Sequence, residues 1–403
     1  MRLTSQEEAM LSGKQGPATA KAMEILVALG GIYGAEQLVP VVSAQVAGVS
    51  YGNLGQAGLD FLRAWADQGA RVVVPTTLNP AGMDLEAWHQ LGVPEAYARY
   101  QLEVIETYRS MGIAISCSCT PYLSGNVPEF GQHLAWSESS AVSYANSVLG
   151  ARTNREGGPS ALAAAITGRT PAYGLHLDEN RKATIVVDVR CTPQSWADFG
   201  ALGYFVGEQA GDQVPYFRFG PAERPGLEEL KALGAAMAAS GAVALYHVHG
   251  ITPEARRHDV FKPQAPTLTI ESLDESYRAL NGAAQSVDLV WIGCPHASLM
   301  EIEQTARLLQ GRQLTSRLWI TAHRHVIREA RARGLMEPIE KAGGQLVADA
   351  CLLGAPLEEM GITSIATNSG KAAFYLRGRH DVQVLFGSLE RCVDAAATGV
   401  WPA

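Results

Sequence analysis

The sequence predicts an α/β protein with largely parallel sheets. Short apolar runs rich in β-branched residues alternate with segments of helical character, as in proteins whose parallel strands are connected by covering helices. The chain has 403 residues, of which 47% are hydrophobic and 18% charged, so it can bury a large core divided among two or three subdomains. Polar or reactive residues stand at the ends of many apolar runs, where open α/β sheets bind ligands.

The first predicted element is a helix near the N-terminus. In the opening segment MRLTSQEEAM, Ser5 and Glu8 have the spacing of a capping box, so a helix should begin there. The segment lacks the charged and then apolar plan of a signal peptide, and no apolar run in the sequence is long enough to cross a bilayer. We therefore expect a cytoplasmic protein.

Further apolar runs are expected to form strands. In chain order they are VVVP (72–75), IAISCSC (113–119), TIVVDV (184–189), VALYHVHG (243–250), DLVWIGC (288–294), RLWITA (317–322), LVADACLL (346–353) and SIATNS (364–369). From about residue 240 onward these runs end in residues that carry chemistry, namely His247, His249, Cys294, His296, His323, Cys351, Asn368 and Ser369. Because parallel strands end at one edge of a sheet, several of these side chains should converge on one site.

Composition and charge restrict the organisation and the partners. No Ser/Gly-rich linker, repeat or low-complexity tract separates independent modules, so residues 1–403 should form one region of tightly packed subdomains, with boundaries near 125–240. The net charge of -8 and the pI near 5.7 argue against binding to nucleic acid or to an anionic membrane. The expected partners are small molecules or proteins.

The stretch GARTNREGGPSALAAA predicts an anion site. Gly157-Gly158 allows close backbone approach, and Pro159 suits the first position of a helix. The free amides of that helix N-terminus, flanked by Arg152 and Arg155, would form a cradle for phosphate or carboxylate. The alternative is a glycine turn before a structural helix, with both arginines in solvent.

The segment TNSGKAA resembles a second such site. Ser369 and Lys371 stand where a strand is followed by a predicted helix, and the ammonium there could meet a substrate carboxylate or phosphate. The segment lacks the spacing of a Walker motif, so it does not imply nucleotide binding. A plain capped helix is the alternative interpretation.

The cysteines suggest reduced thiols or metal ligands. They are scattered through a long chain without a secretory signal, at positions 117, 119, 191, 294, 351 and 392, so a disulfide framework is not expected. Soft thiolates that arrive singly from separate strands can hold an iron-sulfur cluster, and three ligands would leave one iron open to substrate. Buried free cysteine is the commoner explanation for any one of them. The rival metal is zinc, with His247, His249 or His296 joining the thiolates.

Three polar stretches in the first part of the chain are candidates for lining a pocket. Gly48-Val49-Ser50 and Asn79-Pro80 lie in turn-forming segments beside apolar runs, and they form either a pocket wall or ordinary tight loops. Glu138 and Ser139 lie in a segment of small residues with helical character. A carboxylate there is either a buried acid-base group or an exposed helix residue.

Taken together, these motifs resemble the large subunit of the aconitase X family, a branch of the aconitase superfamily. The resemblance covers essentially the whole chain and includes AMEILVALGGIYGAEQLVP, SAQVAGVSYGNLGQAGLDFL, VPTTLNPAGMDLE, SCSCTPYLSGNVPEFGQHLAWSESSAVSYANSVLGARTNREGGPSALAAAITGRTPAYGLHLDEN, IGCPHAS, ADACLLG and TNSGKAAFY. It implies an aconitase-like architecture of several subdomains. The small swivelling domain of the superfamily is not evident after FGSLERCVDAAATGVWPA, so a separate small subunit is expected to complete a heterodimer.

The resemblance implies an iron-sulfur hydro-lyase, most simply with a [4Fe–4S] cluster whose open iron binds the departing hydroxyl while a base removes a proton. Carried over by position, the cluster ligands are Cys119, Cys294 and Cys351, although Cys117 lies two residues from Cys119 on the predicted strand and would face the same side. Glu138 and Lys371 are the expected catalytic residues. The residues expected around the substrate are Gly48, Val49, Ser50, Asn79, Pro80, Glu138, Ser139, Arg152, Arg155, Ser369 and Lys371.

The expected reaction is loss of water from a small hydroxy acid. The form ARTNREGGPSALAAAITG is more similar to the branch that converts mevalonate 5-phosphate to anhydromevalonate phosphate in isoprenoid synthesis. The alternative within the family is cis-3-hydroxy-L-proline dehydratase. Two other classes stay open on the residues alone: a zinc hydrolase, and a binding subunit without catalytic activity.

Overall fold

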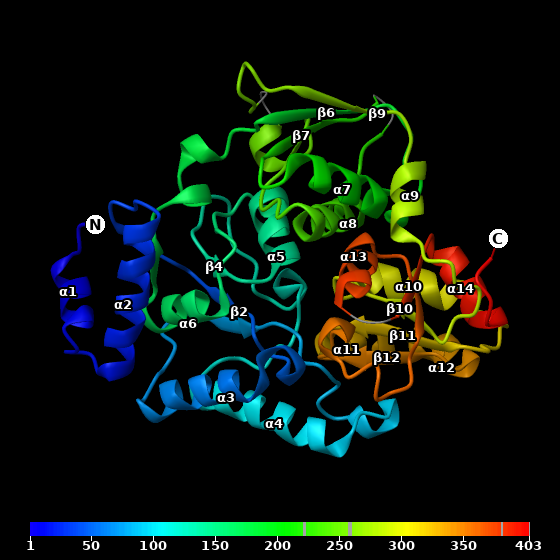
Figure 1. Cartoon of the computed structure of the whole chain (residues 1–403), viewed down its shortest axis with the longest axis horizontal. Helices are drawn as coiled ribbons and strands as arrows, with labels where there is room; N and C mark the ends of the chain where they lie inside the picture. Colours follow the sequence, from blue (N-terminus) through cyan, green and yellow to red (C-terminus); the bar gives the residue numbers. More distant parts are fainter. Residues whose placement is uncertain (221–222, 257–259, 380–381, 403) are drawn as a thin grey trace.

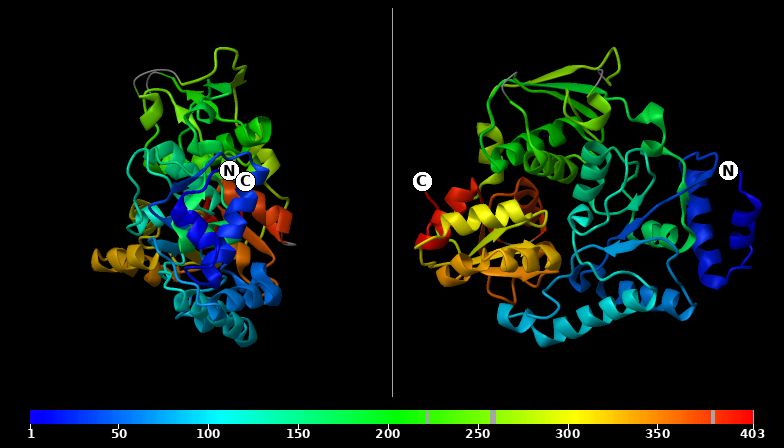
Figure 2. Two further views of the ribbon diagram at one scale, coloured as in Figure 1. Left: turned by 90° about the vertical axis from the view of Figure 1, so that its left-hand side faces the viewer. Right: turned by 180° about the vertical axis from the view of Figure 1, so that it is seen from behind.

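The computed structural model describes residues 1–220, 223–256, 260–379 and 382–402. Three groups of elements follow one another along the chain, and each contains a parallel sheet (Figure 1). They form three lobes: the first is blue to cyan-green, the second is green to yellow-green, and the third is yellow to red (Figures 1 and 2). The predicted α/β class with largely parallel sheets is confirmed.

The first lobe contains a three-stranded parallel sheet of order β3-β2-β4 and a separate antiparallel pair, β1 with β5. Its strands are β1 (Leu38–Pro40), β2 (Ala44–Val46), β3 (Thr76–Leu78), β4 (Ala135–Trp136) and β5 (Arg169–Pro171). Its helices are α1 (Ser5–Leu11), α2 (Pro17–Ile32), α3 (Tyr51–Asp67), α4 (Glu95–Ser110), α5 (Ser139–Tyr144) and α6 (Gly158–Thr167). Apolar side chains of α2, α3, α4 and α6 share one core, which anchors the strand ends that reach the site.

The second lobe is built on four parallel strands in the order β8-β7-β6-β9. They are β6 (Ile185–Val189), β7 (Pro215–Arg218), β8 (His247–Val248) and β9 (Thr267–Ile270), accompanied by helices α7 (Trp196–Ala210), α8 (Leu227–Ser240) and α9 (Asp274–Leu280). Helix α8 packs against α7 and also contacts α5 of the first lobe and α13 of the third. It therefore lies where the three lobes meet (Figure 1).

The third lobe contains five parallel strands in the order β12-β11-β10-β13-β14. They are β10 (Leu289–Ile292), β11 (Arg317–Ala322), β12 (Gln345–Ala348), β13 (Ser364–Thr367) and β14 (Gln383–Phe386). The helices are α10 (Leu299–Leu308), α11 (Arg324–Ala332), α12 (Met336–Ala342), α13 (Gly370–Arg379) and α14 (Leu389–Thr398). Two apolar clusters fill this lobe, and β10 is buried throughout, as expected for the central strand of a sheet covered on both faces.

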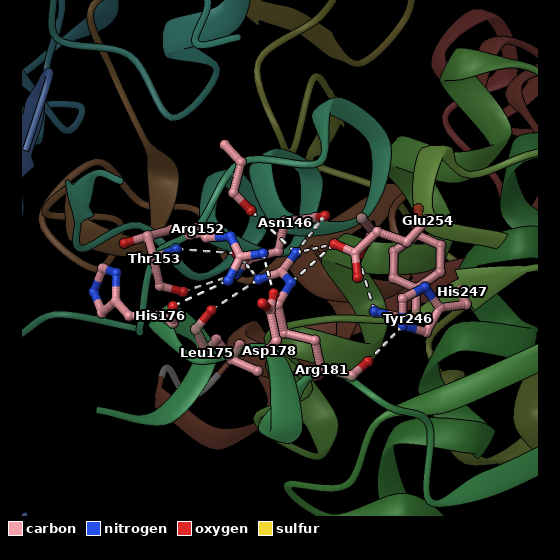
Figure 3. A network of polar contacts seen from close by, with 12 residues as sticks. Asn146, Arg152, Thr153, Leu175, His176, Asp178, Arg181, Tyr246, His247 and Glu254 are labelled. Carbon is pink, nitrogen blue, oxygen red and sulfur yellow. Dashed lines mark hydrogen bonds and ion pairs between the residues drawn. The ribbon is translucent and has the colours of Figure 1, made fainter. Parts of the chain in front are cut away.

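A buried arginine connects the first two lobes. Arg181 is 3% exposed, and its guanidinium donates to the carbonyl oxygens of Asn146, Ala151 and Leu175 (Figure 3). It also forms an ion pair of 2.5 Å with Glu254 of the second lobe. Because an arginine carries five N–H donors in a rigid fork, one side chain satisfies all these acceptors at the lobe boundary.

Two predicted strands are wrong. Residues 72–75 are irregular, and the observed strand β3 begins at Thr76. Residues 113–119 run beside β3 but form only an isolated bridge between Ala114 and Thr77. Cys117 has a φ of 40°, a left-handed conformation that interrupts an extended run.

The N-terminal helix is present, but its cap lies one residue earlier than predicted. The Thr4 hydroxyl accepts from the Glu7 amide, and the Glu7 carboxylate accepts from the Thr4 amide. Glu7 is buried and also pairs with Arg169 at 3.2 Å. This tertiary contact favours the observed capping register over Ser5 and Glu8. Across the described ranges, no helix combines the length and apolar character needed to cross a membrane.

Candidate functional site

The carboxyl ends of strands from the first and third lobes border one cavity of about 290 Å³. In the first lobe, the cavity is lined by residues that follow strands β2, β3 and β4. In the third lobe, it is lined by residues that follow β10, β12 and β13. Predicted site residues that line this cavity are Gly48, Ser50, Asn79, Pro80, Cys119, Glu138, Ser139, Arg155, Cys294, Cys351 and Lys371. The expected convergence of strand ends is therefore observed, across two sheets rather than one.

Three cysteines from separate loops line the cavity: Cys119, Cys294 and Cys351. Burial raises the pKa of Cys119 to about 12 and that of Cys294 well above its ordinary value, so without a metal both stay protonated thiols. Within the described ranges, no three His, Cys, Asp or Glu side chains come close enough together to hold a single metal ion. The three sulfurs thus border a space instead of converging on one point.

Cys117 and Cys119 lie in different surroundings. Cys117 is fully buried in the core of the first lobe, and burial raises the pKa of its thiol well above the usual range. Cys119 lines the cavity instead. The reversed backbone at Cys117 explains the difference, because the alternation that would place both thiols on one face requires an extended strand.

Glu138 and Lys371 form a buried ion pair inside the cavity. Their side chains are 12% and 7% exposed, and the Lys371 ammonium contacts the Glu138 carboxylate directly. Asn79 donates to the other carboxylate oxygen at 2.7 Å, and Lys371 also donates to Ser140 Oγ at 3.1 Å. Burial on its own raises the pKa of Glu138, but the ammonium and these hydrogen bonds lower it to about 2. Burial opposes the charge of Lys371, and the Glu138 carboxylate raises the pKa of the ammonium above its ordinary value.

Two other polar groups belong to different walls of the cavity. The Ser50 hydroxyl donates to the Gly354 carbonyl at 2.8 Å and lies 3.1 Å from the Tyr97 hydroxyl, which fixes it next to the Cys351 loop. Arg155 is exposed and donates to the Ala238 carbonyl of α8 at 3.2 Å. Arg155 therefore presents a positive charge at an open part of the cavity.

Three predicted substrate residues do not line the cavity. Val49 is 1% exposed in the core of the first lobe. Arg152 is held elsewhere by an ion pair with Asp178 and a hydrogen bond to the His176 carbonyl (Figure 3). Ser369 borders a smaller neighbouring pocket, where its hydroxyl donates to the Cys294 carbonyl, so it supports the cysteine loop from behind.

The predicted anion cradle is only partly present. Helix α6 begins at Gly158, with Gly157 as its N-cap and a proline in the first turn, as expected. A Cβ on Gly158 would lie 2.7 Å from the Ala47 carbonyl oxygen, so this glycine permits close packing against the chain that follows β2. Among the described residues of the predicted cradle, Arg155 lines the cavity, whereas Arg152, Gly157 and Gly158 do not.

The structure adds residues that the sequence did not single out for the substrate site. Trp291 and Tyr375 line the cavity, and Tyr375 lies one helical turn after Lys371, so i to i+4 spacing on α13 was the available signal. His296, predicted from the sequence as a strand-end residue near the site and as a possible zinc ligand, also borders the cavity. His247 and His249 lie in the second lobe, bonded to the Arg181 carbonyl and the Tyr216 hydroxyl.

Comparison with known proteins places this architecture in one family. Residues 1–179 match the aconitase X first domain, residues 183–278 the second domain and residues 287–398 the third. The crystal structure of Thermococcus kodakaraensis aconitase X in its holo-form superposes with a TM-score of 0.92 and 50% sequence identity. The match covers 98% of this chain and 100% of that one.

Curated relatives give the same result over nearly the full length. The phosphomevalonate dehydratase large subunit of Methanocaldococcus jannaschii is 48% identical, with 97% of this chain and 98% of the relative aligned. That of Thermococcus kodakarensis is 52% identical over 94% and 95%. The cis-3-hydroxy-L-proline dehydratase of Pseudomonas aeruginosa is 37% identical over 100% of this chain and 71% of its own length. The chain therefore belongs to the aconitase X family.

Proposed function

We propose that this chain is the large subunit of a dehydratase that removes water from mevalonate 5-phosphate to give anhydromevalonate phosphate, a step of isoprenoid synthesis. The observation that carries the proposal is the single cavity in which three cysteines meet the Glu138–Lys371 pair. Relatives named phosphomevalonate dehydratase large subunit are 46–52% identical in four cases and 38% identical in a fifth. Those named for cis-3-hydroxy-L-proline are 35% and 37% identical.

The cysteine set fits an iron-sulfur cluster. Cys119, Cys294 and Cys351 bring three soft sulfur side chains from separate loops to one space, and these three thiolates would hold the cluster. When bound, a [4Fe–4S] cluster held by three thiolates supplies one open iron, a Lewis acid for the departing hydroxyl. Zinc fits less well, because both ring nitrogens of His296 are already hydrogen-bonded to protein groups.

The cationic groups of the cavity suit an anionic substrate. Lys371 and Arg155 line the same cavity, so one can hold the carboxylate of the substrate while the other holds the phosphate. Asn79 and Ser139 both donate to Glu138, and Ser50 is fixed against Gly354. These groups orient the substrate and exclude alternative poses.

Glu138 assists proton transfer once substrate is bound. In the free chain Lys371 keeps the pKa of Glu138 at about 2, which makes the carboxylate a weak base. A substrate carboxylate that competes for the ammonium would weaken this pairing, and burial would then raise the pKa of Glu138. The pair thus couples substrate binding to the basicity of the carboxylate.

A separate small subunit completes the enzyme. The relatives of highest identity cited above are named large subunits, and the cavity is partly open toward Arg155, which is exposed. We propose a heterodimer in which residues 1–403 form the catalytic region as packed α/β subdomains.

One experiment tests the function. The large and small subunits are reconstituted anaerobically with iron and sulfide, and water loss is assayed with mevalonate 5-phosphate and with cis-3-hydroxy-L-proline. We expect turnover of the phosphate substrate alone. Turnover of the proline substrate alone would support the alternative dehydratase, whereas a loaded cluster with no turnover of either would indicate a binding subunit. If the purified enzyme contained one zinc per chain and its activity were stable in oxygen, the proposal of an iron-sulfur cluster would be contradicted.

A further inference from the structure

His296 lies where the three cysteine loops of the cavity meet. It follows Cys294 by two residues in the loop after β10, and it is 1% exposed. An imidazole in such a buried position is costly unless both of its ring nitrogens find hydrogen-bond partners. Both do, and the partners belong to the loops that carry the other two cysteines.

The first set of contacts reaches the Cys119 loop. The backbone N–H of His296 donates to Cys119 Sγ over 3.1 Å. The ring Nδ1 lies 3.1 Å from Ser118 Oγ, next to Cys119 in the chain. Ser118 is fully buried and its amide donates to the Leu78 carbonyl, so this loop is itself anchored to strand β3.

The second contact reaches the Cys351 loop. The ring Nε2 lies 2.9 Å from the Ala350 carbonyl oxygen, directly before Cys351. A carbonyl can only accept, so Nε2 carries the proton and Nδ1 accepts from the Ser118 hydroxyl. One neutral imidazole thus connects two loops that lie 232 positions apart in the chain, from 119 to 351.

We infer that His296 is a positioning residue that holds the loops of Cys119, Cys294 and Cys351 in register around the cavity. The inference rests on the proposed function for its purpose, because ligand loops held in place keep the thiols ready for a cluster. The contacts themselves are within the protein, so the role can be tested on the chain without any metal.

Two substitutions separate the two ring contacts. His296→Asn retains a polar atom near the Nδ1 position but cannot reach Ala350, whereas His296→Gln retains a donor near the Nε2 position but leaves Ser118 without its acceptor. His296→Asn should therefore loosen the Cys351 loop, and His296→Gln should loosen the Cys119 loop. Ser118→Ala, which keeps the imidazole intact, should behave like His296→Gln.

The readout is the alkylation rate of each cysteine in the full-length, cluster-free chain, measured with iodoacetamide under anaerobic, reducing conditions by peptide mass spectrometry. Loss of one buried hydrogen bond should raise the rate of the affected cysteine about tenfold. The rate of the other loop cysteine should stay within about twofold, since its contact is retained. Cys392, which is fully buried in the third lobe and distant in sequence from the three loops, reports any global unfolding.

His247→Asn is the matched control. His247 is also 1% exposed, and its ring bonds the Arg181 carbonyl at 2.8 Å in the second lobe. This substitution should leave the rates of Cys119, Cys294 and Cys351 unchanged. If the His296 variants fail to fold, Ser118→Ala decides the outcome: a faster Cys119 alone supports the inference, and an unchanged Cys119 overturns it.

A second readout uses the reconstituted subunit pair. Release of iron to a chelator should be about tenfold faster in both folded His296 variants than in the wild type. If the wild type takes up no iron and sulfide, the proposed function fails, while the alkylation pattern still decides the positioning role. Equal alkylation rates in the wild type, His296→Asn and His296→Gln would overturn the inference even where the wild type loads a cluster.

Discussion

At the scale of single residues, Glu138 and Lys371 determine each other's ionisation. Both side chains are largely buried, and each is the partner that makes the charge of the other tolerable. Burial favours the neutral form of an acid, whereas an adjacent ammonium favours the charged form. Here the ammonium prevails, and the pKa of Glu138 falls to about 2.

Lys371→Met should reveal this coupling in the pH profile. In the wild type, the pH profile of kcat/KM, which reports the free enzyme, should show no acidic limb from Glu138 above about pH 3, since the pKa of Glu138 without substrate is about 2. Without the ammonium, burial raises the pKa of Glu138, so the carboxylate becomes protonated as the pH falls and an acidic limb appears at higher pH. We also expect kcat/KM to fall at least about a hundredfold, because the cation that we propose as a substrate contact is lost. The measurement is kcat/KM for water loss at several pH values between pH 4 and pH 9.

Lys371→Arg is the control for that profile. It keeps a positive charge next to Glu138, so its activity can fall because the geometry differs, but no new acidic limb should appear. A limb in both variants, or in neither, would contradict the proposed coupling of Glu138 to Lys371.

The pair Cys117 and Cys119 shows how two similar residues acquire different roles. Cys119→Ser should lower the iron and sulfide bound per reconstituted chain and abolish dehydratase activity, because a proposed cluster ligand is lost. Cys117→Ser should retain the cluster, since Cys117 lies in the core. Its cost should appear in the free energy of unfolding instead, as a buried hydroxyl replaces a weakly polar thiol. Iron and sulfide analysis with urea unfolding distinguishes the two. Cluster loss in Cys117→Ser alone would reverse our assignment.

At the scale of elements, the turn between β10 and Cys294 depends on a glycine. Gly293 has a φ of 96°, and a Cβ there would lie 2.1 Å from the Thr321 carbonyl oxygen on the neighbouring strand. Only a residue without a side chain allows this approach. The position of Cys294 at the cavity therefore depends on how closely β10 and β11 pack at their ends.

Gly293→Ala should lower the free energy of unfolding by roughly 3 kcal/mol, because backbone strain and a clash with strand backbone add together. The control is Gly311→Ala, where φ is 73° and no atom lies within 4 Å of the new Cβ; strain alone should cost about 1 kcal/mol there. Urea unfolding of the two variants measures the difference. Equal losses of unfolding free energy in the two variants would show that the ends of β10 and β11 separate at little energetic cost.

Prediction of the elements succeeded where a strand is long and buried and failed where the backbone departs from regular geometry. The run RLWITA forms β11 over its full length, because an internal strand of a parallel sheet is apolar on both faces. The run IAISCSC has the same apolar character, but no local sequence pattern signals a left-handed residue at a cysteine. The observed N-cap of the first helix is Thr4 instead of the predicted Ser5, because Arg169, distant in the chain, pairs with Glu7.

At the scale of the whole molecule, a buried ion cluster joins the second and third lobes. Lys231 on α8 pairs with Glu301 on α10 and, at 2.7 Å, with Glu228. The Glu301 carboxylate also accepts from the Ser298 amide at 2.9 Å in the capping box that begins α10. The helix that follows the Cys294 loop is thus attached to the helix where the three lobes meet.

Lys231→Met should lower the free energy of unfolding by about 3–5 kcal/mol at neutral pH, because the buried Glu301 and the partly buried Glu228 both lose their cation. In the variant, burial would raise the pKa of both carboxylates above the unfolded value. The folded state would then bind more protons than the unfolded state, and the deficit should shrink as the pH falls toward 4. Denaturant unfolding at several pH values measures this. Lys341→Met, which removes an exposed pair with Glu337, should change stability little.

The sequence by itself determined the fold class, the family and the residue types of the site. The fold class and the candidate residue types depend on local patterns: apolar runs of strand length, glycine turns, and cysteines placed after strands. The family depends on a resemblance that runs along essentially the whole chain. The expected site also took in Val49, which lies between the cavity residues Gly48 and Ser50, and Arg152, which lies three residues before the cavity residue Arg155.

Only the tertiary structure decided which side chains enter the cavity. Asp178 holds Arg152 away from it, the backbone reversal at Cys117 directs one of two neighbouring thiols into the core, and His296 connects loops far apart in the chain. The physical reason is that a side chain's direction depends on backbone dihedrals and on partners supplied by other lobes. Neither is encoded in the residues immediately around it.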